Sequence, residues 1–256
     1  MIIRPSTAAD MDSVGTLVRA SFAERLHRFM TYAQPGIAAF LRAMVEQPKL
    51  FPGHHLLTCM DAAGTVTGFA EFRIEGTTAF LSYICVAPTL RRAGLATRMI
   101  ETFLDRHSGL ALLELDVFDD NEPALRMYER MGFAGTARSL WLARDLPAGA
   151  GAVRAANPAG VIAAFARYGF CEMPVRRDDQ EHRLGRIGAH VLRCFSATDF
   201  DDEVLLAAVR NLLPELDTAL LILPADQAGR WSKHVVNASR RLSLDLQGHP
   251  PKEEAA

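Results

Sequence analysis

The sequence predicts an α/β (α+β) protein with a central mixed, mostly antiparallel sheet flanked by helices, followed by a smaller α/β domain. Three strand-like runs, at 55–60, 66–74 and 78–86, follow one another across short turns and predict an antiparallel meander. The last strand leads into a turn and then into the first residues of a helix. This strand–turn–helix stretch extends to about residue 100. A small-residue stretch at 147–152 then separates these patterns from a second set of strands and helices.

The chain length and the small-residue stretch at 147–152 predict two domains, residues 1–146 and 153–247, with 147–152 as the linker between them. We expect a disordered tail at 248–256. Apolar residues at 49% and charged residues at 23% are typical of a folded globular chain, which argues against disorder.

Charge and cysteine usage narrow the class of function. A net charge of -2 provides no basic field for nucleic acid or an anionic membrane surface. We find neither a signal-peptide pattern nor 18 consecutive apolar residues, and we therefore expect a cytoplasmic protein. The four cysteines are widely spaced without a C-x-x-C pair, so we expect free thiols and no metal site.

The first elements lie before the meander. Ile2 and Ile3 predict a short strand, and Ser6 or Thr7 can cap a helix over 11–22. Apolar residues at helical spacing predict a second helix over 37–45, which Pro48 ends. The connector 24–35 between these helices mixes polar and aromatic side chains, so it is either a solvated helix end or a surface that touches a substrate.

After the meander the pattern alternates between helix and strand. We expect a helix over 96–107, a strand over 110–118, and a strand from Phe133 to Leu142. Between the last two, Asn121 can cap a helix that Gly132 ends.

The turn between the third strand of the meander and the following helix is suited to phosphate. Pro88 ends the strand, and Gly94 and Ala96 leave the backbone N–H groups at the helix start accessible. Such a helix start carries the positive end of the helix dipole, and Arg91 and Arg92 add fixed positive charge. The sequence therefore predicts a pyrophosphate-binding turn.

Two motifs resemble a known family. Arg91-x-x-Gly94-x-Ala96, preceded by Val86-x-Pro88, resembles the acyl-CoA loop of the GCN5-related N-acetyltransferases (GNAT). The second motif lies downstream, in the family's order, and consists of Leu115-Asp116-Val117, Asn121, Ala124, Tyr128 and Gly132-Phe133. The resemblance covers about residues 1–145 and implies a GNAT-like fold with acetyl-CoA as the acyl donor.

The resemblance implies a set of donor-binding positions. Ile84, Cys85 and Val86 would pair through their backbone with the pantetheine arm. The pyrophosphate would lie among Arg91, Arg92, Ala93, Gly94, Leu95, Ala96 and Thr97, with Asn121 and Tyr128 also touching CoA.

Catalytic groups are implied in the same way. Tyr128 matches the tyrosine that protonates the leaving thiolate in many members; the alternative is a core aromatic with an exposed hydroxyl. Asp116 stands where some members carry a glutamate base, and strand alternation points it away from Leu115 and Val117. It could also be a surface carboxylate, with water relaying the proton to Asp116, Glu114 or Glu71. We place Phe29, Tyr32, Glu71 and Tyr83 at the acceptor site.

The second domain carries no second phosphate-binding turn. Residues 162–170 faintly repeat 125–133, so a degenerate GNAT-like half and an unrelated α/β unit both remain open, and we favour the unrelated unit. A basic cluster over 176–190 contains interrupting acidic residues and suggests a solvated loop. We expect this domain to shape the acceptor cleft or to form an oligomer interface, such as that of a homodimer.

These observations predict an acyl-CoA-dependent N-acetyltransferase, without a metal, that transfers acetyl directly to a small amine or an amino acid. Two alternatives remain: acetylation of a protein N-terminus or lysine, and an inactive module that senses acyl-CoA. Thiol release from acetyl-CoA across a panel of amines separates the enzymes from the sensor.

Overall fold

The computed structural model describes residues 1–247, and the tail predicted at 248–256 lies outside this range. The chain forms two compact units. Unit 1 contains Met1–Ser21, Leu41–Ala137 and the segment that begins at Ser239. Unit 2 contains Phe22–Phe40 and Arg138–Ala238. None of the helices in the described part of the chain is long and apolar enough to cross a membrane.

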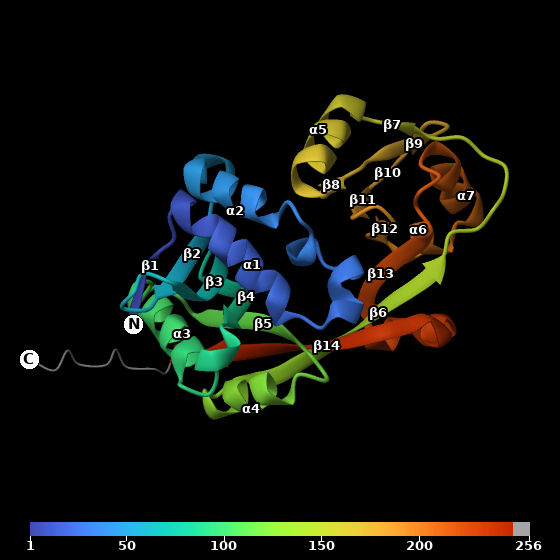
Figure 1. The fold of residues 1–256 in the computed structure, drawn as a ribbon. Helices are drawn as coiled ribbons and strands as arrows, with labels where there is room; N and C mark the ends of the chain where they lie inside the picture. Colours follow the sequence, from blue (N-terminus) through green and yellow to red (C-terminus); the bar gives the residue numbers. More distant parts are fainter. Residues whose placement is uncertain (248–256) are drawn as a thin grey trace, which may run out of the picture. The chain divides into compact units, whose positions relative to one another are not determined.

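Unit 1 is built on a sheet in the order β1-β2-β3-β4-β5-β14 (Figure 1). Neighbouring strands are antiparallel except β4 and β5, which are parallel. Its strands are β1 Ile2–Pro5, β2 His54–Met60, β3 Val66–Glu75, β4 Thr78–Val86, β5 Leu112–Phe118 and, from Ser239 onward, β14 Val235–Asp245. Its helices are α1 Met11–Ser21, α3 Leu95–Asp105, α4 Glu122–Arg130 and, from Leu41 onward, α2 Ile37–Glu46. The predicted meander is confirmed as β2-β3-β4.

One face of this sheet packs on α3 and α4. Strand alternation turns Leu81 and Leu115 toward the same side, where they form a core cluster with Met99 of α3. The Phe72 and Phe103 rings stack within it with centroids 3.7 Å apart. Asn121 caps α4 as predicted, because its side chain accepts a hydrogen bond from the Ala124 N–H.

Unit 2 contains a sheet in the order β6-β13-β12-β11-β8 and a small sheet β10-β9-β7. Its strands are β6 Ala134–Asp145 from Arg138 onward, β7 Arg154–Ala155, β8 Phe170–Glu172, β9 Val175–Arg177, β10 Gln180–His182, β11 Leu184–Ile187, β12 Val191–Cys194 and β13 Thr218–Pro224. Its helices are α5 Pro158–Tyr168, α6 Ala197–Asp201 and α7 Glu203–Leu212.

Each unit has the same central connectivity. In unit 1 the β3-β4 hairpin is followed by a helical crossover to β5, which is parallel to β4. In unit 2 the β11-β12 hairpin is followed by α6 and α7 and then by β13, which is parallel to β12. An antiparallel strand completes each sheet: β14 beside β5, and residues 139–145 of β6 beside β13. The repeat therefore lies in these strands rather than in residues 162–170, where α5 precedes β8.

The units do not follow the predicted division at 147–152. Residues 239–245 of β14, which the sequence analysis did not recognise as a strand, pair with β5 and place Leu242 and Leu244 in the core of unit 1. The N-terminal connector belongs to unit 2. Sheet pairing between residues distant in sequence therefore decides the division.

The connector 24–35 is not a solvated helix end. It forms two 3-10 turns, Glu24–Phe29 and Thr31–Ala33, with Leu26, Met30 and Tyr32 buried. The basic cluster at 176–190 is also not a loop, because most of it lies in β9, β10 and β11. Its charges are paired within unit 2, and the arginine pairs are Arg176–Glu181, Arg177–Asp202, Arg183–Glu172 and Arg186–Glu215.

The four cysteines are free, as predicted. Cys59, Cys85 and Cys194 are buried and Cys171 is half-buried. Within residues 1–247 there is no group of three or more histidine, cysteine or acidic side chains that could hold a metal ion.

Candidate functional site

The two parallel strands at the centre of unit 1 separate partway along their length. Four residue pairs join β4 to β5, beginning at Thr78–Leu112 and ending at Leu81–Leu115. On its other side β4 stays paired with β3 as far as Gly68–Val86. The register between β4 and β5 thus leaves residues 82–86 of β4 with a backbone edge that β5 does not occupy.

A β-bulge lies where β4 leaves β5. Glu71 pairs with Tyr83, whereas the next β3 residue, Phe72, pairs with Leu81, so Ser82 is the extra residue. Leu81 and Ile84 consequently both pack on the α3 side of the sheet. Bulges of this kind are common beside active sites because they re-aim side chains.

Cys85 lies on this free edge. Burial raises the pKa of its thiol to about 12, so the thiol keeps its proton at neutral pH. A protonated thiol is a poor nucleophile. The site therefore offers Cys85 for packing and backbone pairing rather than for covalent catalysis.

The chain passes from this edge into the predicted phosphate-binding turn. Arg92 and Gly94 both have left-handed backbones, with φ of 66° and 73°. Gly94 is the N-cap of α3 but has no side chain to cap it, and the first bond back to the turn runs from the Arg98 N–H to the Gly94 carbonyl. The helix N-terminus over Leu95–Thr97 therefore has backbone donors without a side-chain cap.

Positive charge surrounds this turn. Arg92, Ala93 and Gly94 are exposed, and Arg91 donates from Nε to the Val86 carbonyl at 3.4 Å. The dipole of α3 and two guanidinium groups thus act together beside the free β4 edge. The residues from Ile84 to Thr97, which are predicted to bind the donor, lie along this edge and turn.

Glu71 lies beside the bulge, opposite Tyr83. Its side chain is 2% exposed, and burial raises its pKa to about 8. Nδ1 of His54 lies 2.8 Å from Oε1, and burial lowers the pKa of His54. Burial therefore favours a neutral Glu71 carboxyl and a neutral His54 imidazole, and in this pair the carboxyl O–H donates a hydrogen bond to Nδ1 of His54. A buried carboxyl that titrates near neutrality is suited to proton transfer.

Asp116 points away from Leu115 and Val117, as predicted, but it is held by a cation. Its two oxygens accept from Nε and Nη2 of Arg241 at 2.6 and 2.9 Å. A bidentate guanidinium occupies both carboxylate oxygens, which leaves neither free to face an acceptor amine. Asp116 is thus a weaker candidate base than Glu71.

Tyr128 lies in the core of unit 1. It is 4% exposed and makes an edge contact with Phe133 at 5.4 Å between ring centroids. Burial raises its pKa, so the phenol keeps its proton throughout the physiological range. Asn121, in contrast, is exposed at the N-terminus of the same helix.

The four predicted acceptor residues fall in different units. Glu71 and Tyr83 are register partners in unit 1. Phe29 and Tyr32 belong to unit 2, where Phe29 packs against the cluster of Ile187, Val191 and Leu220 and Tyr32 is buried.

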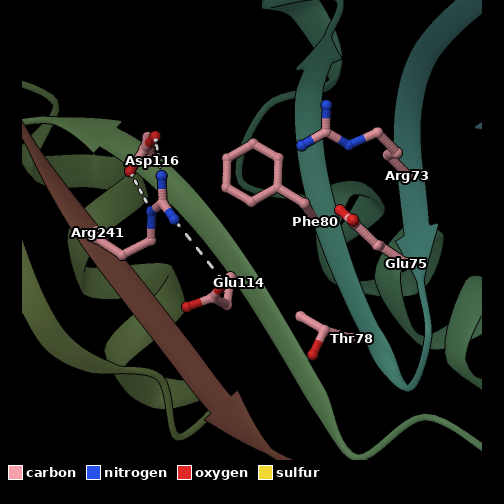
Figure 2. Close-up of a pocket in the computed structure, with 7 residues that line it drawn as sticks. All are labelled: Arg73, Glu75, Thr78, Phe80, Glu114, Asp116 and Arg241. Carbon is pink, nitrogen blue, oxygen red and sulfur yellow. Dashed lines mark hydrogen bonds and ion pairs between the residues drawn. The ribbon is translucent and has the colours of Figure 1, made fainter. Parts of the chain in front are cut away.

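An open pocket of about 440 Å³ lies on the face of the unit 1 sheet opposite α3 (Figure 2). It is lined by Arg73, Glu75, Thr78, Phe80, Glu114, Asp116 and Arg241. Figure 2 shows that these side chains come from β3, β4, β5 and β14 and that Arg241 reaches both acidic side chains of β5.

Three residues around the site escaped sequence analysis: His54, Arg73 and Arg241. Alternation along β3 places Arg73 on the same face as Glu71, and this signal was available in the sequence. The pairing of Arg241 with Asp116 was not, because it depends on register between strands about 125 residues apart.

Unit 2 lacks these features in its corresponding elements. β12 has four residues, and all four pair with β13. The crossover helix α6 is capped by the Ser196 side chain, and α7 by that of Asp202. No strand edge or uncapped helix start like that of unit 1 occurs at this position in the described part of unit 2.

The acetyltransferase (GNAT) family model matches residues 21–133. A mycothiol acetyltransferase of Clavibacter michiganensis subsp. michiganensis is 33% identical over 84 residues, which are 32% of this chain and only 28% of that protein.

Two solved structures are similar over almost the whole chain. A tandem GNAT protein from the clavulanic acid biosynthesis pathway has a TM-score of 0.67 at 12% identity, covering 97% of this chain and 99% of that one. A GCN5-related N-acetyltransferase from Sphaerobacter thermophilus has a TM-score of 0.58 at 14% identity, covering 96% and 95%. Residues 21–133 therefore match the GNAT acetyltransferase family model, and the chain has the fold of the tandem GNAT protein.

Proposed function

We propose that this chain is an acyl-CoA-dependent N-acetyltransferase that transfers acetyl from acetyl-CoA directly to the amine of a small molecule. The observation that carries the proposal is the separation of β4 from β5 after Leu81–Leu115, at a bulge and immediately before an uncapped helix start. An extended strand edge followed by backbone donors suits a ligand with an amide-containing arm and a pyrophosphate.

The residues present fit the donor. The backbone of residues 84–86 would pair with the pantetheine arm, and the N–H groups at the start of α3 would hold the pyrophosphate together with Arg91 and Arg92. Gly94 matters because its left-handed backbone turns the chain into the helix without a side chain over these donors. Asn121 would reach the donor from the N-terminus of α4.

The reaction needs a neutral amine that attacks the thioester carbonyl. The C–N bond forms, the C–S bond breaks, and a proton leaves the nitrogen while the thiolate gains one. We assign the base to Glu71, in preference to Asp116, because Glu71 is buried beside the bulge and Asp116 is committed to Arg241. His54, 24% exposed, would pass the proton from Glu71 to solvent.

Tyr128 remains the proposed acid. Its raised pKa keeps the proton available, but the same burial makes a lasting phenolate costly. We therefore propose that Tyr128 stabilises the departing sulfur through its O–H and is reprotonated within the same turnover. The protonated Cys85 thiol supports direct transfer rather than an acetyl-cysteine intermediate.

Unit 2 is proposed to be a degenerate GNAT-like half. Its repeated strand connectivity supports a common architecture, whereas the short β12 and the capped crossover helices argue against a second donor site. One active site per chain follows, with a stoichiometry of one acetyl-CoA per chain.

Thiol release from acetyl-CoA, measured across small amines, amino acids, amino sugars and peptides, tests this function. We expect turnover with at least one small amine, with one thiol released per N-acetyl product. Turnover confined to peptide N-termini or lysines would replace the proposed acceptor class. Acetyl-CoA binding without turnover on any acceptor would favour the acyl-CoA-sensing module.

A further inference from the structure

We propose that the sheet-face pocket lined by Arg73, Phe80 and Arg241 binds the carboxylate and carbon skeleton of an amino acid acceptor. This rests on the proposed acetyl transfer and identifies the substrate class. The pocket has an aromatic side chain between two guanidinium groups: the Cζ atoms of Arg73 and Arg241 lie 6.0 and 4.8 Å from the Phe80 ring centroid (Figure 2).

Arg73 and Arg241 differ in whether their guanidinium group is paired with a carboxylate. Arg241 is neutralised, because Asp116 binds it through both oxygens and Glu114 lies 3.8 Å away. Arg73 forms no ion pair with any carboxylate in the described part of the chain, although it lines the same pocket. Its planar guanidinium is suited to bidentate binding of a carboxylate.

Arg73 also stands at a useful place relative to Glu71. The two residues lie on the same face of β3, two positions apart, which corresponds to roughly 6–7 Å along a strand. A molecule whose carboxylate binds Arg73 can therefore direct an amine toward Glu71 and the bulge at Ser82. The positive charge of Arg73 acts on the Glu71 carboxyl and lowers its pKa against the effect of burial.

The remaining lining suits the rest of such a ligand. The face of Phe80 can pack against a carbon chain. Glu75 and Glu114 contribute negative charge that attracts an acceptor arriving as an ammonium ion. A positively charged anchor, an aromatic wall and a negative rim together favour a zwitterion over a simple amine.

Titration calorimetry of the full chain tests the pocket independently of turnover. The probes are L-amino acids and, for each, the amine that lacks the carboxylate. We expect at least one amino acid to bind the wild type, its decarboxylated amine to bind at least tenfold more weakly, and Arg73→Gln to remove this preference. Arg106→Gln, an exposed arginine change at the end of α3, should keep it.

Kinetics then separate the pocket from the proposed function. In Arg73→Gln, KM for the amino acid should rise at least tenfold while KM for acetyl-CoA stays constant. The increase of kcat/KM with pH that Glu71 causes should also move to higher pH, because the positive charge that lowers the pKa of Glu71 is removed. Equal binding of acid and amine, binding unaffected by Arg73→Gln, or no binding of any amino acid would overturn the pocket assignment. Turnover of amines without carboxylate dependence would overturn it while leaving the acetyltransferase intact.

Discussion

Glu71 and His54 are the residues on which proton transfer in the proposed reaction depends. Burial holds the pKa of Glu71 near 8, far above that of an exposed glutamate, and lowers that of His54. Below pH 8 the protonated form of Glu71 predominates and cannot accept a proton, whereas above pH 8 the carboxylate predominates. The residue is therefore placed to make activity depend on pH near neutrality.

Glu71→Gln should lower kcat/KM by roughly 10²- to 10⁴-fold, the usual contribution of a general base. In the wild type, kcat/KM should rise with pH up to about 8, and this limb should disappear in the variant. Steady-state rates between pH 6 and 9.5 measure both effects. Glu129→Gln, on the exposed side of α4, serves as control and should retain the limb. A Glu71→Gln enzyme with the wild-type pH profile would exclude Glu71 as the base.

Tyr128→Phe tests the acid without removing the ring. The aromatic contact with Phe133 should remain, because it does not involve the hydroxyl, so the unfolding midpoint should change little. The turnover number should fall at least about tenfold while acetyl-CoA affinity stays close to that of the wild type. Single-turnover rates and calorimetry separate the two quantities. Unchanged turnover would leave Tyr128 with a packing role alone.

At the scale of elements, α4 and α5 offer a matched pair of N-caps. Asn121 accepts from the Ala124 N–H, and Asn157 accepts from the Gly160 N–H in unit 2, each at the third helical position. Both helices also carry a proline in their first two positions. The local chemistry of the two caps is therefore nearly the same, although only Asn121 belongs to the proposed donor site.

Asn121→Ala and Asn157→Ala should each destabilise the protein by about 0.5–2 kcal/mol, the usual cost of losing such a cap. Only Asn121→Ala should also weaken acetyl-CoA binding, by a severalfold increase in Kd. Denaturant unfolding and calorimetry on both variants give the comparison. Equal acetyl-CoA affinity in the two variants would restrict Asn121 to capping.

For the whole molecule, the order of the strands explains why two units arise from one continuous chain. Residues 239–245 supply the strand beside β5, and their side chains Leu242 and Leu244 belong to the core of unit 1. Residues 139–145 supply the strand beside β13 in unit 2. Each unit thus depends on a strand that, along the sequence, directly follows a segment of the other unit.

The fragment 1–146 should consequently be unstable. Without β14, the edge of β5 would be unpaired and Leu113 and Leu115 would lose neighbours, which favours aggregation. We expect this fragment to be insoluble or to unfold without a cooperative transition, whereas the full chain unfolds cooperatively. Circular dichroism and analytical ultracentrifugation test this. A soluble fragment 1–146 that binds acetyl-CoA would show that β14 is dispensable.

Sequence reasoning recovered the elements whose signals are local. The β2-β3-β4 meander, the helix after Gly94 and the Asn121 cap all follow from periodicity, turn residues and caps within a few positions. It missed β14, although Leu242 and Leu244 alternate with polar residues, because a short half-polar run resembles a loop until its partner strand is known.

The local geometry of the candidate site was predictable to a similar extent. The turn from Arg91 to Thr97 forms the helix start that was expected, because glycine and helix periodicity fix it locally. The assignment of Asp116 as the base did not anticipate Arg241, and the burial that tunes Glu71 was invisible in the sequence. Charges and pKa values depend on neighbours brought together by folding, which one sequence does not reveal.

The central claim is that the β4 edge and the turn at Gly94 hold acetyl-CoA. Gly94 and Gly64 both have left-handed backbones, with φ of 73° and 81°, and a Cβ at either would meet open space. Gly94→Val and Gly64→Val therefore impose comparable backbone strain, but only Gly94→Val places a side chain at the proposed pyrophosphate site.

Titration calorimetry with acetyl-CoA on the wild type and these two variants is the most direct measurement. We predict one acetyl-CoA per wild-type chain, similar affinity in Gly64→Val, and loss of measurable binding in Gly94→Val although both variants remain folded. Wild-type affinity in a folded Gly94→Val protein, or no acetyl-CoA binding by the wild type, would contradict the claim.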